Sequence, residues 1–180
     1  NDTTGVYPTV SAFFSAIDRN TPCNIAVLAG HCTARTSVAG YENRPLTDTE
    51  RTKMLDLMEN AIRDGACGLS LGLMYEPGIY AGIDELKDVA RLCEKYDRPM
   101  TVHPRACSAV SMTYPLLGRP HLLRALDELV EIASGTKMKL HYSHAIFVGR
   151  RSFRCKDELL EILHGLRDKG VDIGFDIYSE

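Results

Sequence analysis

The feature that most constrains the fold is a unit that repeats along the chain: a short apolar run rich in β-branched residues, a polar or glycine-containing turn, and a longer stretch with helical spacing. The apolar runs predict strands at 24–31, 66–73, 99–103, 138–144 and 171–178. Helical spacing predicts helices at 9–19, 47–64, 83–96, 122–133 and 157–169. Strands and helices therefore alternate through most of the sequence.

The helix that begins near Thr47 has the clearest end signals. Thr47 and Glu50 have the spacing of a capping box, and Gly65 supplies a helix stop. The preceding residues, 32–46, are expected to form a long connection, and no helix is predicted within them.

A parallel neighbour needs a crossover long enough to carry a helix, so this alternation predicts right-handed parallel β-α-β units. The expected fold class is α/β, with about five parallel strands alternating with helices, and no linker or low-complexity tract marks an internal domain boundary. Two architectures fit such units, an open doubly wound sheet and a part of an eight-stranded barrel. Periodicity alone does not choose between them.

Polar side chains capable of metal binding or acid–base chemistry stand at the carboxyl end of nearly every predicted strand. They are His31, Ser70, His103 with Arg105, Ser143 with His144, and Asp176. In parallel α/β folds this edge is where ligands bind, because the loops there vary while the opposite edge serves stability. The sequence therefore predicts a functional site at the carboxyl ends of the strands.

His103 and His144 are the candidate metal ligands, because neutral imidazole is the commonest zinc ligand and neighbouring strand ends can bring two imidazoles to one ion. Taken alone, either histidine is more often a capped or water-bonded residue. The sequence leaves open whether His141 lines the core or the site. His121 and His164 fall on predicted helices and are assigned no function.

Composition narrows the classes of partner. A formal charge of −3 and a pI near 6.1 give no basic surface, so nucleic acid is not an expected partner. The chain has no apolar run of about 18 residues and no signal-peptide pattern at its start, which predicts no membrane partner and a cytoplasmic location. The six cysteines are scattered without a C-x-x-C pair, as expected for reduced thiols.

Five sequence blocks share one resemblance. They are GHCTAR at 30–35, GACGLSLGLMYEPGIYA at 65–81, His103-x-Arg105, Ser143-His144, and Asp176-Ile177-Tyr178. Together they resemble the N-acyl-D-amino-acid deacylases (D-aminoacylases) of the amidohydrolase superfamily. The similarity runs from about Asn24 to the end of the chain, and the block at 65–81 is long enough to be highly specific.

The resemblance implies a zinc-bearing, partial TIM-like (β/α) barrel in which His103 and His144 are metal ligands. Zinc in such a site lowers the pKa of bound water to about 7 and polarises the amide carbonyl of an N-acyl-D-amino acid or related linear amide. Ser70, Arg105 and Tyr178 would line the substrate cleft, with Tyr178 a contact for the substrate carboxylate or the developing oxyanion.

The resemblance also implies that residues 1–180 are one segment of the catalytic barrel. The family's His-x-His pair and cysteine ligand would precede this segment and its catalytic aspartate would follow, so the segment alone is expected to be inactive. Ala145 and Ile146 follow His144 where family members commonly carry a histidine and a lysine. A cation that could pair with a substrate carboxylate is therefore missing at this point.

Two other interpretations come from different classes. The first is a non-catalytic or degenerate module that binds a small ligand. The second is a nucleotide-binding open α/β domain, suggested by the glycines in 68–72, although this segment lacks the G-x-G-x-x-G spacing. Under any of these interpretations an open parallel sheet exposes two edge strands, so we expect the isolated chain to form a homodimer through them.

Overall fold

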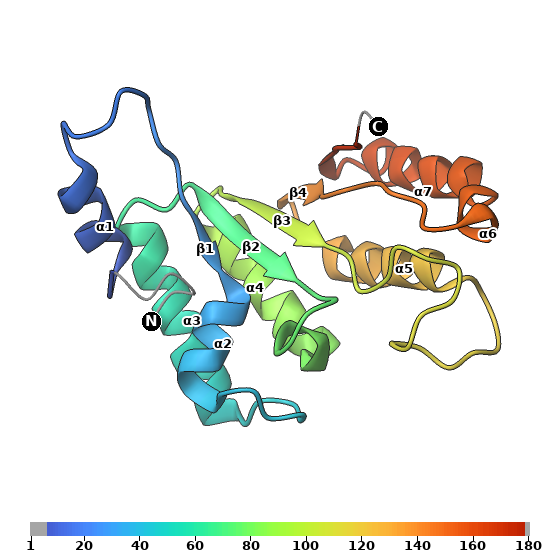
Figure 1. Cartoon of the computed structure of the whole chain (residues 1–180), viewed down its shortest axis with the longest axis horizontal. Helices are drawn as coiled ribbons and strands as arrows, with labels where there is room; N and C mark the ends of the chain where they lie inside the picture. The colour runs from blue at the N-terminus through green and yellow to red at the C-terminus, as the bar shows by residue number, and fades with distance from the viewer. Residues whose placement is uncertain (1–6, 179–180) are drawn as a thin grey trace.

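The computed structural model describes residues 7–178 and contains one parallel sheet (Figure 1). Its strands are β1 (Leu28–Gly30), β2 (Gly68–Gly72), β3 (Pro99–His103), β4 (Lys139–Tyr142) and β5 (Asp172–Phe175). They lie side by side in the order β1-β2-β3-β4-β5, and every neighbouring pair is parallel. A doubly wound sheet reverses its strand order, whereas a barrel adds each strand beside the preceding one. The fold is therefore a partial TIM-like barrel.

The helices are α1 (Val10–Ile17), α2 (His31–Ala39), α3 (Asp48–Arg63), α4 (Ile83–Lys95), α5 (His121–Ala133), α6 (Arg150–Phe153) and α7 (Lys156–Asp168), with a 3₁₀ turn η1 (Gly78–Tyr80). Helices α3, α4, α5 and α7 follow one another, each in contact with the next. Crossovers of one hand between sequential strands place successive helices on the same side of a sheet. The opposite side is the one that faces the interior of a barrel.

Most of the predicted elements are confirmed within two or three residues at each end, and β3 has the predicted bounds. The capping box is also confirmed. The Glu50 backbone N–H donates to Thr47 Oγ1 over 3.3 Å, and the Thr47 N–H donates to Glu50 Oε2 over 2.8 Å. Four of the five strands are shorter than predicted, and the largest differences are at β1, which has 3 residues, and β5, which has 4.

One prediction about secondary structure was wrong. Residues 32–46 were expected to form a connection without a helix, but α2 occupies the first part of that segment. The buried residues of α2 are His31, Ala34 and Arg35, so two of the three side chains on its inner face are polar. Periodic spacing of apolar residues could not predict this helix, because the side chains that hold it in place are mostly polar.

Alternation along the central strands separates the core from the open face. Met100 and Val102 of β3, with Leu140 and Tyr142 of β4, are buried in the cluster that also includes the inner faces of α4 and α5. Ser70, Thr101 and His141 are register partners across β2, β3 and β4 and lie on the other face, because successive side chains of a strand alternate. The sheet thus has one packed face and one face available for a site.

The border strands β1 and β5 carry apolar side chains that are not covered within residues 7–178. Leu28 is 39% exposed, Phe175 is 40% exposed and Ile177 is 64% exposed. The expected homodimer through these edges stays a prediction. Among the described residues, no helix has the length and apolar character needed to cross a bilayer.

Candidate metal centre

The structure brings the two predicted metal ligands together. His103 is the last residue of β3, and His144 follows β4 by two residues. Their ring centroids are 5.3 Å apart and the rings are inclined by 63°. Two adjacent parallel strands therefore deliver two imidazoles to one point at the carboxyl edge of the sheet.

The state of His103 suits metal binding. Its Nε2 atom is buried and has no hydrogen-bond partner. Burial, and then the proximity of His144, lower the pKa of His103 below its ordinary value of 6.5. A neutral imidazole with an unpartnered nitrogen is the form that coordinates a metal ion, so these residues fit one.

Asp176 holds the backbone at the other imidazole, whose Nδ1 is buried and, like His103 Nε2, has no hydrogen-bond partner. Its Oδ1 accepts the backbone N–H of His144 over 2.9 Å and lies 3.3 Å from Nδ1 of the same residue. Its Oδ2 lies 2.6 Å from Nε2 of His141. The hydrogen bond to His141 lowers the pKa of Asp176, with a further contribution from the His144 N–H, and together they outweigh the opposing effect of burial. A carboxylate that holds a ligating histidine orients it and keeps it basic.

The backbone at His144 has an unusual conformation. Its φ of 59° lies in the left-handed region, which costs a residue with a Cβ atom about 1–2 kcal/mol. The Asp176 carboxylate accepts a hydrogen bond from the backbone N–H of this same residue. Strained backbone that the surroundings hold in place is frequent at functional sites.

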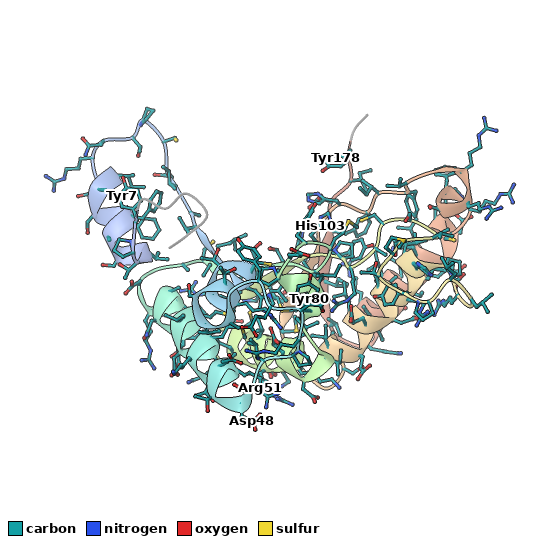
Figure 2. The ribbon with its side chains drawn as sticks, turned by 60° about the horizontal axis from the view of Figure 1, so that its bottom comes forward. Tyr7, Asp48, Arg51, Tyr80, His103 and Tyr178 are labelled. Atoms are coloured by element: carbon teal, nitrogen blue, oxygen red, sulfur yellow. The ribbon has the colours of Figure 1, made fainter. Side chains whose placement is uncertain are left out.

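Two tyrosine rings flank the histidine pair. Tyr75 packs on His103 with centroids 4.9 Å apart, and Tyr178 stacks on His144 with centroids 5.3 Å apart and an angle of 13° between the rings. Figure 2 shows His103 and Tyr178 close together, away from Asp48 and Arg51 on the helical side. Tyr178, a predicted substrate contact, thus lies beside the pair. Tyr75, from the loop after β2, also lies beside the site.

The other two predicted substrate contacts differ in their surroundings. Ser70 lies on the open face of β2, in register with Thr101. Arg105 is only 6% exposed: its Nε donates to Glu128 over 3.0 Å, its Nη1 to the Ile79 carbonyl over 2.5 Å, and its Nη2 to the Ala81 carbonyl over 3.0 Å. The guanidinium braces η1 against α5, and direct substrate contact by Arg105 stays a prediction.

Two of the remaining histidines also have defined places. His121 is 2% exposed and anchors the loop before α5, because its Nδ1 accepts the Ser111 N–H over 2.7 Å. His164 lies exposed on α7. Within residues 7–178, no group of three or more His, Cys, Asp or Glu side chains is arranged to hold a metal ion.

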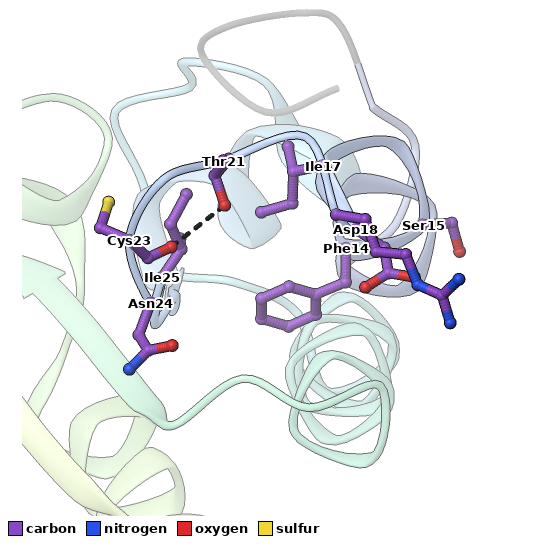
Figure 3. A pocket seen from close by; sticks show the side chains of 9 residues that line it. Phe14, Ser15, Ile17, Asp18, Thr21, Cys23, Asn24 and Ile25 are labelled. Atoms are coloured by element: carbon purple, nitrogen blue, oxygen red, sulfur yellow. Dashed lines mark hydrogen bonds and ion pairs between the residues drawn. The ribbon is translucent and has the colours of Figure 1, made fainter.

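A pocket of about 550 Å³ lies apart from this site, between α1 and the segment that follows it (Figure 3). Phe14, Asp18 and Asn24 are among its lining residues, and Thr21 Oγ1 donates to the Cys23 carbonyl over 3.0 Å. The pocket contains none of the predicted site residues. A second pocket, of about 350 Å³, adjoins Arg105, Met74 and Met112.

Comparison with known proteins gives a consistent result. No protein-family model matches the chain. D-aminoacylase from Alcaligenes xylosoxydans xylosoxydans is 29% identical over 162 residues, which are 89% of this chain and 31% of that protein. N-acyl-D-aspartate deacylase from the same organism is 29% identical over 140 residues, which are 78% of this chain and 26% of that protein.

A solved structure has the same fold. The crystal structure of N-acyl-D-glutamate deacylase from Bordetella bronchiseptica, complexed with zinc and a phosphonate inhibitor, superposes with a TM-score of 0.86 at 28% identity, over 97% of this chain and 35% of that one. The chain thus spans about a third of the length of the relatives it matches. The resemblance to the N-acyl-D-amino-acid deacylases is confirmed.

Proposed function

We propose that the full-length protein uses zinc to hydrolyse the amide bond of N-acyl-D-amino acids or related linear amides, and that His103 and His144 are two of the zinc ligands. The convergence of these imidazoles carries the proposal: their centroids are 5.3 Å apart and His103 Nε2 is buried without a partner. The zinc in the related Bordetella bronchiseptica deacylase supports the choice of metal.

Bound zinc would supply a water of lowered pKa and polarise the scissile carbonyl. The chain's own residues prepare the ligands. Asp176 accepts from the His144 backbone N–H and so fixes the backbone from which that ring projects, while the buried Nδ1 of the ring has no hydrogen-bond partner. Burial keeps His103 neutral, and Tyr75 packs against its ring. These contacts would limit the reorganisation needed when the metal binds.

Three residues would act on the substrate. Tyr178 is 60% exposed beside His144, where its hydroxyl would contact the substrate carboxylate or the developing oxyanion. Ser70 would line the cleft on the open face of β2. Arg105 would act from behind the cleft by holding the Ile79 and Ala81 carbonyls. Ala145 and Ile146 bring no charge after His144, so we place recognition of the substrate carboxylate elsewhere.

Hydrolysis of a panel of N-acetyl-D-amino acids by the full-length protein tests this proposal. We expect activity that a chelator removes and added zinc restores, and we expect the His144→Ala variant to fall to background. His164→Ala is the matched control, because that histidine is exposed on α7, and it should keep full activity. Activity that survives both the chelator and the His144→Ala substitution would rule out the metal mechanism.

A further inference from the structure

The pocket of about 350 Å³ lies at the same edge of the sheet as the histidine pair. Its walls come from three loops, and each loop follows a strand: the loop after β2, the loop between β3 and α5, and the loop after β4. Arg105, one of the lining residues, follows His103 by two positions. Met74, another, precedes Tyr75, whose ring packs on His103. The pocket therefore adjoins the candidate metal centre.

Hydrogen bonds between the loops hold the walls of this pocket. Arg105 Nη1 donates to the Ile79 carbonyl over 2.5 Å, which joins the loop after β3 to the loop after β2. The Thr113 hydroxyl donates to the Arg105 carbonyl over 3.2 Å. The Val148 N–H donates to the Cys107 carbonyl over 3.0 Å, which joins the loop after β4 to the loop after β3. The shape of the pocket is thus set by the fold before a ligand enters.

The polar side chains that line the pocket are already bonded within the protein. Arg105 donates from Nε to Glu128 and from its two terminal nitrogens to backbone carbonyls. The Ser108 hydroxyl donates to a backbone carbonyl over 2.6 Å, and the Ser111 hydroxyl lies 2.6 Å from that of Thr113. Among the described residues that line it, the pocket therefore has no unpaired cation for an anionic group.

The other lining side chains are apolar: Met74, Ile79, Cys107, Met112 and Val148. Burial raises the pKa of Cys107 to about 11, so this residue stays a neutral thiol at physiological pH. Methionine is flexible and unbranched, and it adapts to ligands of varied shape. The group that this pocket suits is therefore neutral, apolar and variable in length.

The chemistry of an N-acyl-D-amino acid indicates which part of it this group is. The carboxylate and the side chain leave from one carbon atom, on the amine side of the scissile bond, and the acyl chain extends on the other side. Tyr178, the proposed carboxylate contact, stacks on His144. The pocket lies at the other end of the pair, where Tyr75 packs on His103. The two halves of the substrate therefore have separate places.

We propose that this pocket binds the acyl chain of the substrate, and that the protein prefers linear aliphatic acyl chains longer than acetyl. This inference rests on the proposed function and adds to it the part of the substrate that determines specificity. The volume of about 350 Å³ is near the lower end of the range for small-molecule sites, which suits a chain of a few carbon atoms.

Substrates that differ only in the acyl chain test the proposal on the zinc-loaded, full-length protein. The amino-acid part stays constant, and the acyl group is acetyl, butanoyl, hexanoyl or decanoyl. We expect kcat/KM to rise by up to about fourfold for each methylene that the pocket buries, and to stop rising once the chain outgrows the pocket. Hydrolysis with a kcat/KM that stays level or falls from acetyl to hexanoyl overturns the proposal and leaves the proposed function intact.

Met112→Asp places a carboxylate at the mouth of the pocket. Met112 is 99% exposed, so the substitution should change the stability of the fold little. We expect the ratio of kcat/KM for hexanoyl to that for acetyl to fall about tenfold, because a hydrated charge opposes burial of an apolar chain beside it. Leu117→Asp is the matched control: Leu117 is 89% exposed in the same loop and does not line the pocket. It should keep the parent ratio, and a Met112→Asp variant with the parent ratio contradicts the proposal.

A second series separates the acyl chain from the amino-acid side chain. Here the acyl group stays acetyl, and the side chain grows from D-alanine to D-norleucine. Met112→Asp should leave the dependence on side-chain length as it is in the parent. A change in this series and none in the acyl series would assign the pocket to the side chain and so overturn the proposal.

Calorimetry in chelator measures binding of the N-acetyl and N-hexanoyl compounds without turnover. We expect the hexanoyl compound to bind more tightly, and we expect Met112→Asp to remove the difference. If the N-acyl compounds are not hydrolysed, the proposed function fails, yet this difference in binding still supports an acyl-chain site. Equal binding of the two compounds to the parent counts against the pocket, whatever the activity.

Discussion

The histidine pair and the His31 cluster, in which Glu85 contacts both His31 and Arg35, start from the same kind of residue and reach opposite states. His31 and His103 both stand at the carboxyl end of a strand in the same sheet. His31 is completely buried and bound to Glu85, whereas His103 has an unpartnered Nε2 and no carboxylate beside it. Position along the strand therefore does not distinguish a candidate metal ligand from a histidine that is paired with a carboxylate. The two histidines differ in the side chain that the fold places beside each ring.

The largest effect should come from removing His103, whose Nε2 has no hydrogen-bond partner. We expect His103→Ala to lose bound zinc and to bring hydrolysis to background, because His103 supplies one of the two imidazoles that meet at the carboxyl edge of the sheet. The free energy of unfolding of the metal-free protein should change by no more than about 1 kcal/mol, since the ring gives up no hydrogen bond. Metal analysis and urea unfolding in chelator measure the two effects. A large loss of stability would mean that His103, like His31, contributes to the stability of the fold.

Glu85→Ala should be the most damaging change to stability. It leaves Arg35 buried without its carboxylate, and breaking a buried pair from one side costs about 3–5 kcal/mol. Glu131→Ala is the matched control, because Glu131 pairs with Lys87 at the surface and is 56% exposed. Urea unfolding should show a large shift for the first variant and little for the second. Equal shifts would mean that burial does not distinguish the two carboxylates.

The Asp176→Ala variant tests the same comparison at the candidate metal centre. Glu85 hydrogen-bonds the ring of His31, whereas Asp176 hydrogen-bonds the backbone of His144, is partly exposed and lies beside the proposed metal. We expect zinc affinity to fall about 10–100-fold, as for other carboxylates behind a ligating histidine, with a smaller stability loss than in Glu85→Ala. Competition with a chromophoric chelator measures the affinity. Asp172→Ala, on exposed β5 backbone, should leave the affinity unchanged.

The smallest effect is expected at Glu59, which has several partners on a helix surface and is 19% exposed, against 4% for Glu85. Lys95 and Arg63 each donate to its Oε1 over 2.8 Å, and Tyr96 donates to the same oxygen. The hydrogen bond from Lys95, followed by that from Tyr96, lowers the pKa of Glu59 to about 2. Its contribution to stability is therefore present above the ordinary pKa near 4.5 and is lost as the pH falls toward 2.

Urea midpoints of the parent and of Glu59→Gln at pH 7 and at pH 2.5 check this sign. We expect a small difference at pH 7 that shrinks in acid. A difference as large as that of Glu85→Ala would show that the number of partners, rather than burial, sets the stability of both clusters.

Much of the fold could be predicted from the sequence because the signals were local. The capping box at Thr47 and Glu50 needs only four consecutive residues, and the β3 run from Pro99 to His103 stands out by its own composition. Helix α2 was missed because its inner face is held by Arg35 and His31, whose partner Glu85 lies 50 or more residues away. The contacts that hold α2 in place join residues that lie far apart in the sequence.

The candidate site could also be predicted only in part. The positions of His103 and His144 at strand ends were enough to predict that they meet, because a parallel sheet aligns its carboxyl ends, whereas Tyr178 was predicted from the family resemblance. The partners of Arg105 and Asp176 were not predictable. Arg105 donates to Glu128, 23 residues further along the chain, and Asp176 accepts from His144, 32 residues before it. Spacing in the sequence indicates which edge of the sheet a side chain reaches. It does not show which other groups that side chain contacts there.

The left-handed backbone at His144 sets a limit on how stable this region can become. Glycine adopts such a φ without steric penalty, so a glycine there would relax the turn after β4 while deleting the imidazole. A substitution that relaxed this turn would therefore remove one of the two imidazoles of the candidate metal centre. The strained backbone and the candidate ligand are properties of the same residue.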